Sequence, residues 1–220
     1  MVRYRSYGSG TPVTLIGHGL GATPGEARLP ASGLPGTRVV VTLPSHGDAP
    51  DAPAGYWDYR RIAADLRAVA REVGATRAVG VSLTSGALLS LLADEPDAFD
   101  RVALLLPAVL DEPRALLARE YAITVIGGPP EYLAERRAAF RRLDGALAEL
   151  PGRTPVPDRS VLGAVTVPVL VVGATEDPLH PEHVAKETAA ALPNSRLELV
   201  PSWLTRRSEV RGWLGDFLRG

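Results

Sequence analysis

The sequence predicts an α/β protein in which helices cover both faces of a mostly parallel sheet. Short apolar segments alternate along the chain with segments whose apolar residues recur at helical spacing. The length of 220 residues suits one domain with a single sizeable core. Its composition, 45% hydrophobic and 22% charged, is typical of a soluble globular protein. We therefore expect residues 1–220 to form one domain.

About seven strands are expected, most of them buried. The segment RYRSYGSG near the start of the chain fits a weaker edge strand. The others are short apolar segments of the kind that parallel sheets bury on both faces. These predicted strands cover residues 13–18, 38–44, 77–82, 101–107, 167–173 and 195–200.

Helices are expected between these strands. In residues 59–75, Ile62, Leu66 and Val69 fall on one face, and Gly74 suits the C-terminal cap. Three further helices are predicted over residues 83–99, 181–193 and 208–218.

Residues 109–160 interrupt the alternation of strand and helix. They are rich in Arg, Glu, Pro and Ala, and the sequence Gly-Gly-Pro-Pro at 127–130 predicts a break between helices. One interpretation is a solvated helical insertion, and the other is a small lid over the ends of the strands. The two interpretations are compatible.

The composition also excludes several classes of function. A net charge of −1 provides no broad basic surface for nucleic acid or anionic lipid, and no cysteine is present to bind metal or form a disulfide. The N-terminus lacks the apolar segment of a signal peptide, and no apolar run approaches the ~20 residues of a membrane helix. We expect a cytoplasmic protein that acts on a small molecule, without a membrane or nucleic-acid partner.

Four segments carry motifs that, in their order and spacing, resemble the α/β-hydrolase family. They are LIGHGLGA (15–22), LPSHGDA (43–49), VGVSLTSGALL (79–89) and VPVLVVGATEDPLHP (167–181). The resemblance extends over nearly the whole chain. It implies the α/β-hydrolase fold, with residues 109–160 as its helical lid.

Ser82 lies where a strand should turn sharply into a helix. In the family this turn, the nucleophile elbow, projects the serine hydroxyl above the sheet and needs small neighbours two residues before and two after it. Gly80 meets the first requirement, whereas Thr84 replaces the second glycine of the G-x-S-x-G pattern. The alternative is that Ser82 only caps the helix, a position that serine favours.

The Gly-rich loop after the first buried strand resembles the family's oxyanion loop. The resemblance implies that the backbone N–H groups of Leu20 and Leu83 stabilise charge that develops on a carbonyl oxygen. Gly19 would let the backbone approach a substrate closely. A dinucleotide site is a poor fit, because the glycine spacing differs and no acidic residue ends the next strand. No cofactor is expected.

The acid and the base are the less regular part of the pattern. By resemblance Asp177 is the acid that orients a histidine. The family usually places that histidine after the last strand, but residues 198–214 contain none. His180, three residues after Asp177, and His18, in the oxyanion loop, are the candidates for the base. A zinc site at His180 and His183 is not expected, because Pro181 and the loop disfavour it.

The resemblance therefore predicts a small-molecule acyl hydrolase of the esterase or thioesterase type. Trp57 and Trp203 are further candidates to line the substrate site. One alternative is a non-hydrolytic enzyme, such as a cyclase, lyase or isomerase, that uses the same pocket. The other is a binding protein that has kept the fold and lost the chemistry.

Overall fold

The computed structural model contains one seven-stranded sheet with the strand order β1-β3-β2-β4-β5-β6-β7. Strand β1 pairs antiparallel to β3, and every other pair is parallel. The structure describes residues 2–115, 118–125, 127–203 and 205–220. The strands are β1 (Arg3–Tyr7), β2 (Val13–Ile16), β3 (Thr37–Thr42), β4 (Arg77–Val81), β5 (Arg101–Leu105), β6 (Val169–Ala174) and β7 (Ser195–Val200).

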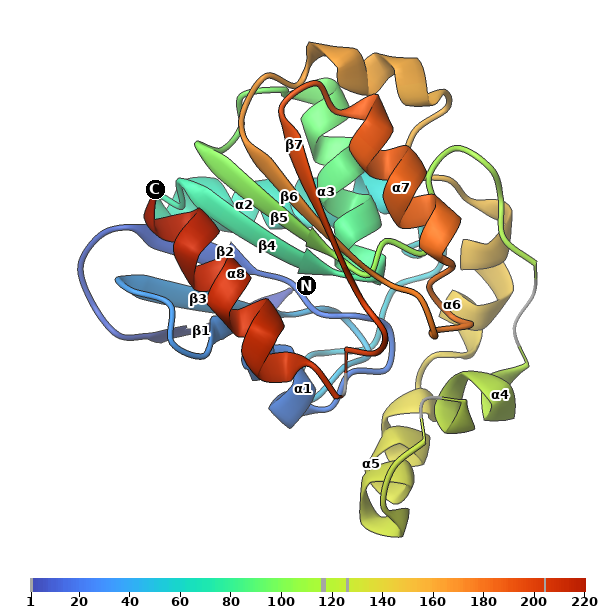
Figure 1. Ribbon diagram of the computed structural model, residues 1–220. Helices are drawn as coiled ribbons and strands as arrows, with labels where there is room; N and C mark the ends of the chain where they lie inside the picture. The colour runs from blue at the N-terminus through green and yellow to red at the C-terminus, as the bar shows by residue number, and fades with distance from the viewer. Residues whose placement is uncertain (1, 116–117, 126, 204) are drawn as a thin grey trace.

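Two groups of helices cover the two faces of this sheet, as Figure 1 shows with α8 in front and α2 behind. One face of the sheet is covered by α2 (Tyr59–Val73), α3 (Leu83–Asp94) and α7 (Glu182–Ala191). Their buried residues belong to one core cluster. The other face is covered by α1 (Pro24–Arg28) and α8 (Arg207–Arg219). The inner strands between the two apolar layers are mostly buried, as their apolar segments predict. Strand β7 is predicted to be buried but forms an edge of the sheet, and only Val200 is buried in it.

The predicted helices agree with the structure in type and differ at their ends. Helix α2 buries Ile62, Leu66 and Val69, and Gly74 closes it in the left-handed conformation with φ of 65°. Helix α3 ends at Asp94, five residues before the predicted end, because Pro96 disfavours helical backbone at Glu95. The short helix α1 is not predicted. Its N-cap Thr23 and Glu26 form a capping box.

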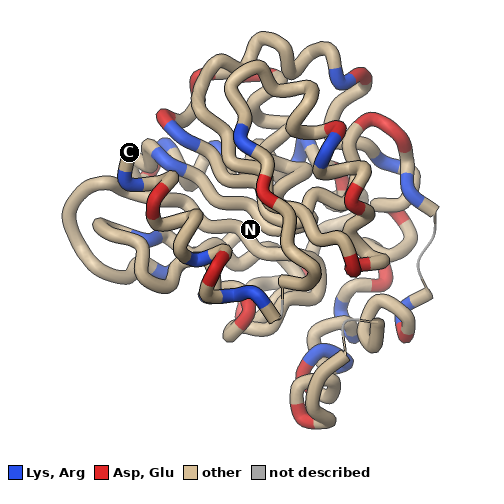
Figure 2. Tube along the Cα trace, viewed as in Figure 1, with Lys and Arg blue, Asp and Glu red and all other residues tan. Residues whose placement is uncertain are grey.

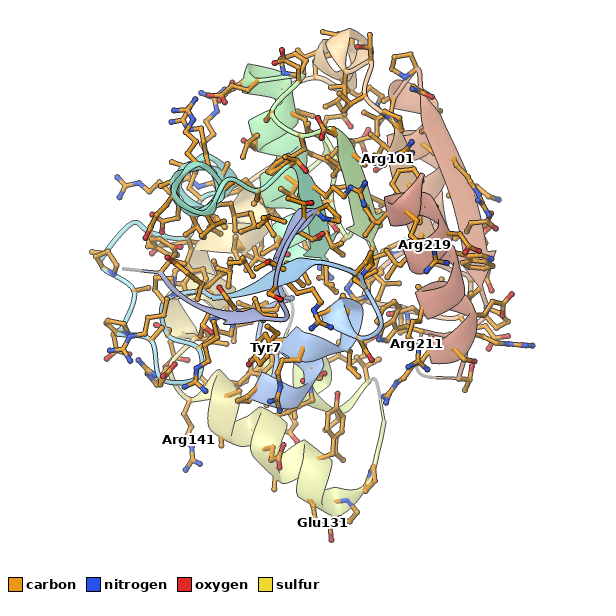
Figure 3. All side chains as sticks on the ribbon, turned by 90° about the vertical axis from the view of Figure 1, so that its left-hand side faces the viewer. Tyr7, Arg101, Glu131, Arg141, Arg211 and Arg219 are labelled. Carbon is orange, nitrogen blue, oxygen red and sulfur yellow. The ribbon has the colours of Figure 1, made fainter. Side chains whose placement is uncertain are left out.

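The described residues between 109 and 160 include several helices, which lie beyond the C-terminal ends of the strands. Their α-helices are α4 (Arg119–Thr124), α5 (Pro130–Phe140) and α6 (Asp144–Glu149), with the 3₁₀ turns η2 (Leu150–Gly152) and η3 (Arg159–Ala164) after them. In Figure 1, α4 and α5 project below the body of the molecule. Figure 3 shows the labelled side chains of Glu131 and Arg141 pointing outward from this projection.

The last helix is fixed to the sheet near the C-terminus. The Arg101 guanidinium at the start of β5 lies 5.5 Å from the ring centroid of Phe217 on α8, on the side seen in Figure 3. Basic and acidic residues are interspersed along the trace in Figure 2, consistent with a net charge of −1.

Candidate active site

Ser82 occupies a strained turn between β4 and α3. Its φ of 51° and ψ of −105° lie in a region that residues other than glycine rarely adopt. Its side chain makes no capping hydrogen bond to the helix, so the simple cap interpretation does not describe it. The turn depends on Gly80, where an added Cβ would lie 2.7 Å from the Thr84 carbonyl oxygen and 2.8 Å from the Ser85 nitrogen.

Thr84 fits where the motif has glycine because a neighbouring strand end has no side chain. A Cβ added at Gly17 would lie 2.7 Å from the Thr84 Cβ. The Thr84 side chain therefore occupies the space that a side chain at position 17 would fill. The Thr84 hydroxyl also accepts a hydrogen bond from the Val81 N–H at 2.9 Å. The departure from G-x-S-x-G is therefore accommodated by Gly17.

A continuous chain of hydrogen bonds joins Ser82, His180 and Asp177. The distance from Ser82 Oγ to His180 Nε2 is 2.9 Å, and His180 Nδ1 lies 2.8 Å from Asp177 Oδ2. If the Nδ1–H group donates to the carboxylate, Nε2 has a lone pair for the serine proton. The structure thus brings together two residues of one loop with a serine 98 positions away.

The backbone after β6 explains how one short loop positions both residues. The Leu179 N–H donates to Asp177 Oδ1 at 2.9 Å, and the His180 N–H donates to the Asp177 carbonyl oxygen at 3.2 Å. This local turn points the His180 ring back over the carboxylate. The loop is also tied to the adjacent strand end, because the Glu176 N–H donates to the Pro201 carbonyl oxygen at 2.9 Å.

Asp177 is held in its ionised form. Burial of the carboxyl group favours the neutral acid, but the hydrogen bond and charge of His180 and the two backbone N–H donors outweigh it. The pKa of Asp177 is consequently lowered from its ordinary value. A carboxylate in this state can accept the His180 Nδ1 proton and stabilise a positive imidazole.

His18 is a structural residue of the Gly-rich loop. Its Nε2 accepts a hydrogen bond from the Leu43 N–H at 3.1 Å, which leaves Nδ1 to donate to the Gly19 carbonyl oxygen at 2.8 Å. Both ring nitrogens are therefore engaged, and the ring is 3% exposed. Burial lowers the pKa of His18 and keeps it neutral. Of the two histidine candidates, His180 forms a hydrogen bond with Ser82, whereas both ring nitrogens of His18 are bonded to backbone groups.

His46, in the loop after β3, also has both ring nitrogens beside backbone groups. Its Nε2 accepts from the Gly21 N–H at 2.9 Å, and Nδ1 lies 3.0 Å from the Pro44 carbonyl oxygen. Burial, and then the neighbouring His18 ring, lower the pKa of His46 to about 3. The two rings, 4.5 Å apart, fasten the Gly-rich loop to the loop after β3.

The amides of Leu20 and Leu83 are available for an anion. Leu83 is the first residue of α3, and neither N–H donates a hydrogen bond within the part of the chain that the structure describes. Both residues lie with Ser82 around one small cavity. Gly19 adjoins Ser82 closely, since a Cβ there would lie 3.3 Å from the Ser82 Cβ.

A larger cavity of about 230 Å³ opens over Ser82 and His180. Gly19 and Trp203 line it as expected. Its other walls come partly from side chains of the helical segment 109–160: Ala122, Val125, Tyr132, Arg136, Phe140 and Leu147.

Trp57 is a correction to the expected site. The indole is 3% exposed, packs edge-on against Tyr56, and is absent from the cavity over Ser82. It instead lines a separate hollow beside Gly145. The reason is that the segment before α2 turns its aromatic residues into the core cluster beneath α6.

Three side chains fix the helical segment to the body of the protein. Glu26 Oε1 accepts from the Tyr132 hydroxyl at 2.6 Å and from Arg136 Nη1 at 3.2 Å. Arg136 is buried, and its guanidinium stacks 5.4 Å from the Phe140 ring centroid. Its charge therefore has a partner within the wall of the cavity.

Neither a metal site nor a membrane span is found in the described ranges of the chain. No cluster of three or more His, Cys, Asp or Glu residues there could ligate an ion. Within the same ranges, every helix is too short or too polar to cross a bilayer.

The sheet order, the strained serine turn and the helical segment define the α/β-hydrolase fold. Over its whole length the chain is similar to a hydrolase from Pseudomonas aeruginosa, with a TM-score of 0.82, 19% identity and 94% of that chain covered. It is similar to the enol-lactonase from Burkholderia xenovorans, with a TM-score of 0.80, 19% identity and full coverage against 96% of that chain. An esterase from Exiguobacterium antarcticum has a TM-score of 0.80 at 18% identity, with 100% of this chain and 96% of that one covered. No family model matches the sequence.

Proposed function

We propose that the protein is a serine hydrolase that cleaves small carboxylic esters or thioesters. The observation that carries this proposal is the hydrogen-bonded chain from Ser82 through His180 to Asp177, at 2.9 and 2.8 Å. The cavity beside it gives a substrate access to the serine. Structural neighbours described as a hydrolase, an enol-lactonase and an esterase support the same reaction class.

In the first half of the reaction, Ser82 Oγ attacks the carbonyl carbon of the substrate. The hydroxyl proton passes to His180 Nε2 as the new C–O bond forms. Asp177 stabilises the resulting imidazolium. The carbonyl oxygen gains negative charge, which the amides of Leu20 and Leu83 and the N-terminus of α3 stabilise.

In the second half, the bond to the leaving group breaks and His180 returns its proton to the departing alcohol or thiol. Water then attacks the acyl-serine and gives a proton to His180. Collapse of this second intermediate releases the carboxylic acid and restores the Ser82 hydroxyl. Residues 109–160 act in this scheme as the lid that encloses the substrate, because α4 and α5 supply one wall of the cavity.

Labelling with a fluorophosphonate, followed by peptide mass spectrometry, tests the proposal. We expect rapid labelling confined to Ser82 and none in Ser82→Ala. In His180→Ala the labelling rate and esterase kcat should fall about 10³-fold or more, because the serine loses its base.

His183→Ala is the matched control. His183 lies three residues after His180 and is exposed, so its loss should leave the labelling rate unchanged. A folded wild-type protein that is not labelled would contradict the proposal. The fold would then serve a non-hydrolytic enzyme or a binding protein.

A further inference from the structure

Arg114 is a half-buried arginine that lines the cavity over the proposed nucleophile, and it forms no ion pair within the described chain, although the Asp177 carboxylate is near enough to act on its charge. Its guanidinium makes one hydrogen bond, from Nη2 to the Leu179 carbonyl oxygen at 3.3 Å. Among the described residues, no carboxylate oxygen lies within ion-pair distance of it. Because arginine keeps its proton even when burial lowers its pKa, a cation and several unused N–H donors remain at this position.

Tyr59, at the start of α2, adds a second unused donor. The residue is 6% exposed, and its hydroxyl has no hydrogen-bond partner within the described chain. Its ring is held in place, because a Cβ at Gly86 would lie 2.5 Å from the Tyr59 Cε1. Burial raises the pKa of Tyr59 to about 12, so the hydroxyl keeps its proton and can donate it.

Arg114 and Tyr59 line the same small cavity as Ser82. Its volume is about 60 Å³, and the two proposed oxyanion residues, Leu20 and Leu83, also line it. A carbonyl group at Ser82 would therefore adjoin this cavity, whose other polar side chains are the Arg114 guanidinium and the Tyr59 phenol. The rest of the lining is apolar and includes Ala146, Leu147 and Leu150.

We propose that this cavity is an acyl pocket for substrates whose acyl chain ends in a carboxylate, which Arg114 and Tyr59 bind. The site thus takes half-esters or half-thioesters of short dicarboxylic acids, and the larger cavity receives the alcohol or thiol. Two charge-assisted hydrogen bonds from the guanidinium and one from the phenol suit a carboxylate. This inference rests on the proposed hydrolase function.

The test compares two esters that differ at the end of the acyl chain. Monomethyl succinate carries a carboxylate where methyl butyrate has a methyl group. We expect kcat/KM of the wild type to be about 10-fold to 100-fold higher for monomethyl succinate, measured as methanol release. This ratio should fall towards one in Arg114→Gln and fall partly in Tyr59→Phe. Arg61→Gln, which changes an exposed arginine on α2, should leave the ratio unchanged.

A structural role for Arg114 predicts a different result. If the guanidinium only braced residues 177–180 through the Leu179 carbonyl, Arg114→Gln would slow both esters equally and leave the ratio unchanged. That outcome, or a wild type with no preference for monomethyl succinate, overturns the inference and leaves the hydrolase proposal intact.

Binding separates this inference from a failure of the hydrolase proposal. Calorimetry with Ser82→Ala should show at least 10-fold tighter binding of monomethyl succinate than of methyl butyrate, and Ser82→Ala/Arg114→Gln should lose the difference. If the wild type hydrolyses neither ester, this result still supports the carboxylate pocket. Equal binding of the two probes overturns it.

Discussion

Ser82 illustrates how one residue depends on neighbours that are distant in sequence. Its left-handed backbone requires close packing of α3 on β4, and Thr84 adds bulk where the familiar motif has none. Gly17, at the end of β2, supplies the missing space. The serine turn at residues 80–84 therefore depends on a sixth residue, Gly17, which follows β2.

This contact predicts a strong coupling between positions 17 and 84. Gly17→Ala should lower the free energy of unfolding by about 1–3 kcal/mol, because its Cβ overlaps the Thr84 side chain. Thr84→Gly in the same chain should recover part of that loss. Urea denaturation of the wild type, both single variants and the double variant measures the coupling. Strictly additive effects would show that Thr84 is not what excludes a side chain at position 17.

The sequence identifies Ser82 and Asp177 through their motifs, but it leaves two histidines open. The choice depends on which imidazole nitrogens the backbone already occupies. Both ring nitrogens of His18 form hydrogen bonds, one with the Leu43 N–H and one with the Gly19 carbonyl oxygen. The bond to Leu43 arises only when β2 and β3 lie side by side. Arg114 is missed altogether, because nothing in its local sequence marks an arginine that lacks a carboxylate.

At the scale of elements, hydrogen bonds to two neutral imidazoles hold together the loop that carries His18 and the loop that carries His46. Each ring accepts one backbone N–H and faces one backbone carbonyl. Protonation of Nε2 would place a proton against an N–H donor and add a charge inside the core. The Gly-rich loop, which carries Leu20, is therefore most stable when both rings are neutral.

This arrangement predicts how stability changes with pH. Between about pH 6.5 and pH 3, His46 takes up a proton on unfolding but stays neutral in the folded chain, so acid favours the unfolded state. The lowered pKa of His18 acts in the same direction. The free energy of unfolding should fall by up to about 1.4 kcal/mol per pH unit for each such histidine.

Urea denaturation between pH 7 and pH 5 checks the expectation. The dependence on pH should be weaker in His46→Gln, which cannot titrate. Equal slopes in the wild type and His46→Gln would contradict the proposed lock.

Element type follows from the sequence more closely than element boundaries do. Periodicity locates α2 and α8, because each buries one apolar face. Helix α3 is buried on all sides and is located by the serine turn before it, and α7 is located by Pro181 at its start. Helix α1 has five residues and depends on its capping box, so no periodic signal precedes it. In residues 109–160, α4 and α6 have six residues each, which is too few to show a periodic apolar face, and α5 is held to α1 by the hydrogen bond between Tyr132 and Glu26.

Over the whole molecule, the sheet separates two apolar clusters. One lies with α2, α3 and α7, and the other with α1 and α8. The residues of the proposed triad lie just beyond the ends of β4 and β6, with β5 between these two strands. A rigid sheet therefore sets the distance between Ser82 and the loop of His180, and both clusters contribute to that rigidity.

The separation predicts which core substitutions are independent. Ile62→Val should cost about 0.5–1.5 kcal/mol and should add to Val210→Ala within about 0.5 kcal/mol, because the sheet lies between these two buried residues. Ile62→Val with Leu66→Ala, one turn apart on α2, should depart from additivity. Urea denaturation of the wild type and of the two single variants and the double variant of each pair measures both. Coupling as large across the sheet as within α2 would argue against two distinct clusters.

The position of His180 has a consequence for the evolution and engineering of such proteins. In the proposed triad the base and the acid span four residues, Asp177 to His180, on one self-bonded turn. The segment from Asp177 to His180 could therefore be transferred to another α/β-hydrolase sheet, after the strand that corresponds to β6. The segment after β7 then has no part in proton transfer, although Trp203 still lines the cavity, and a search for relatives should look for D-x-x-H rather than for a histidine near the end of the chain.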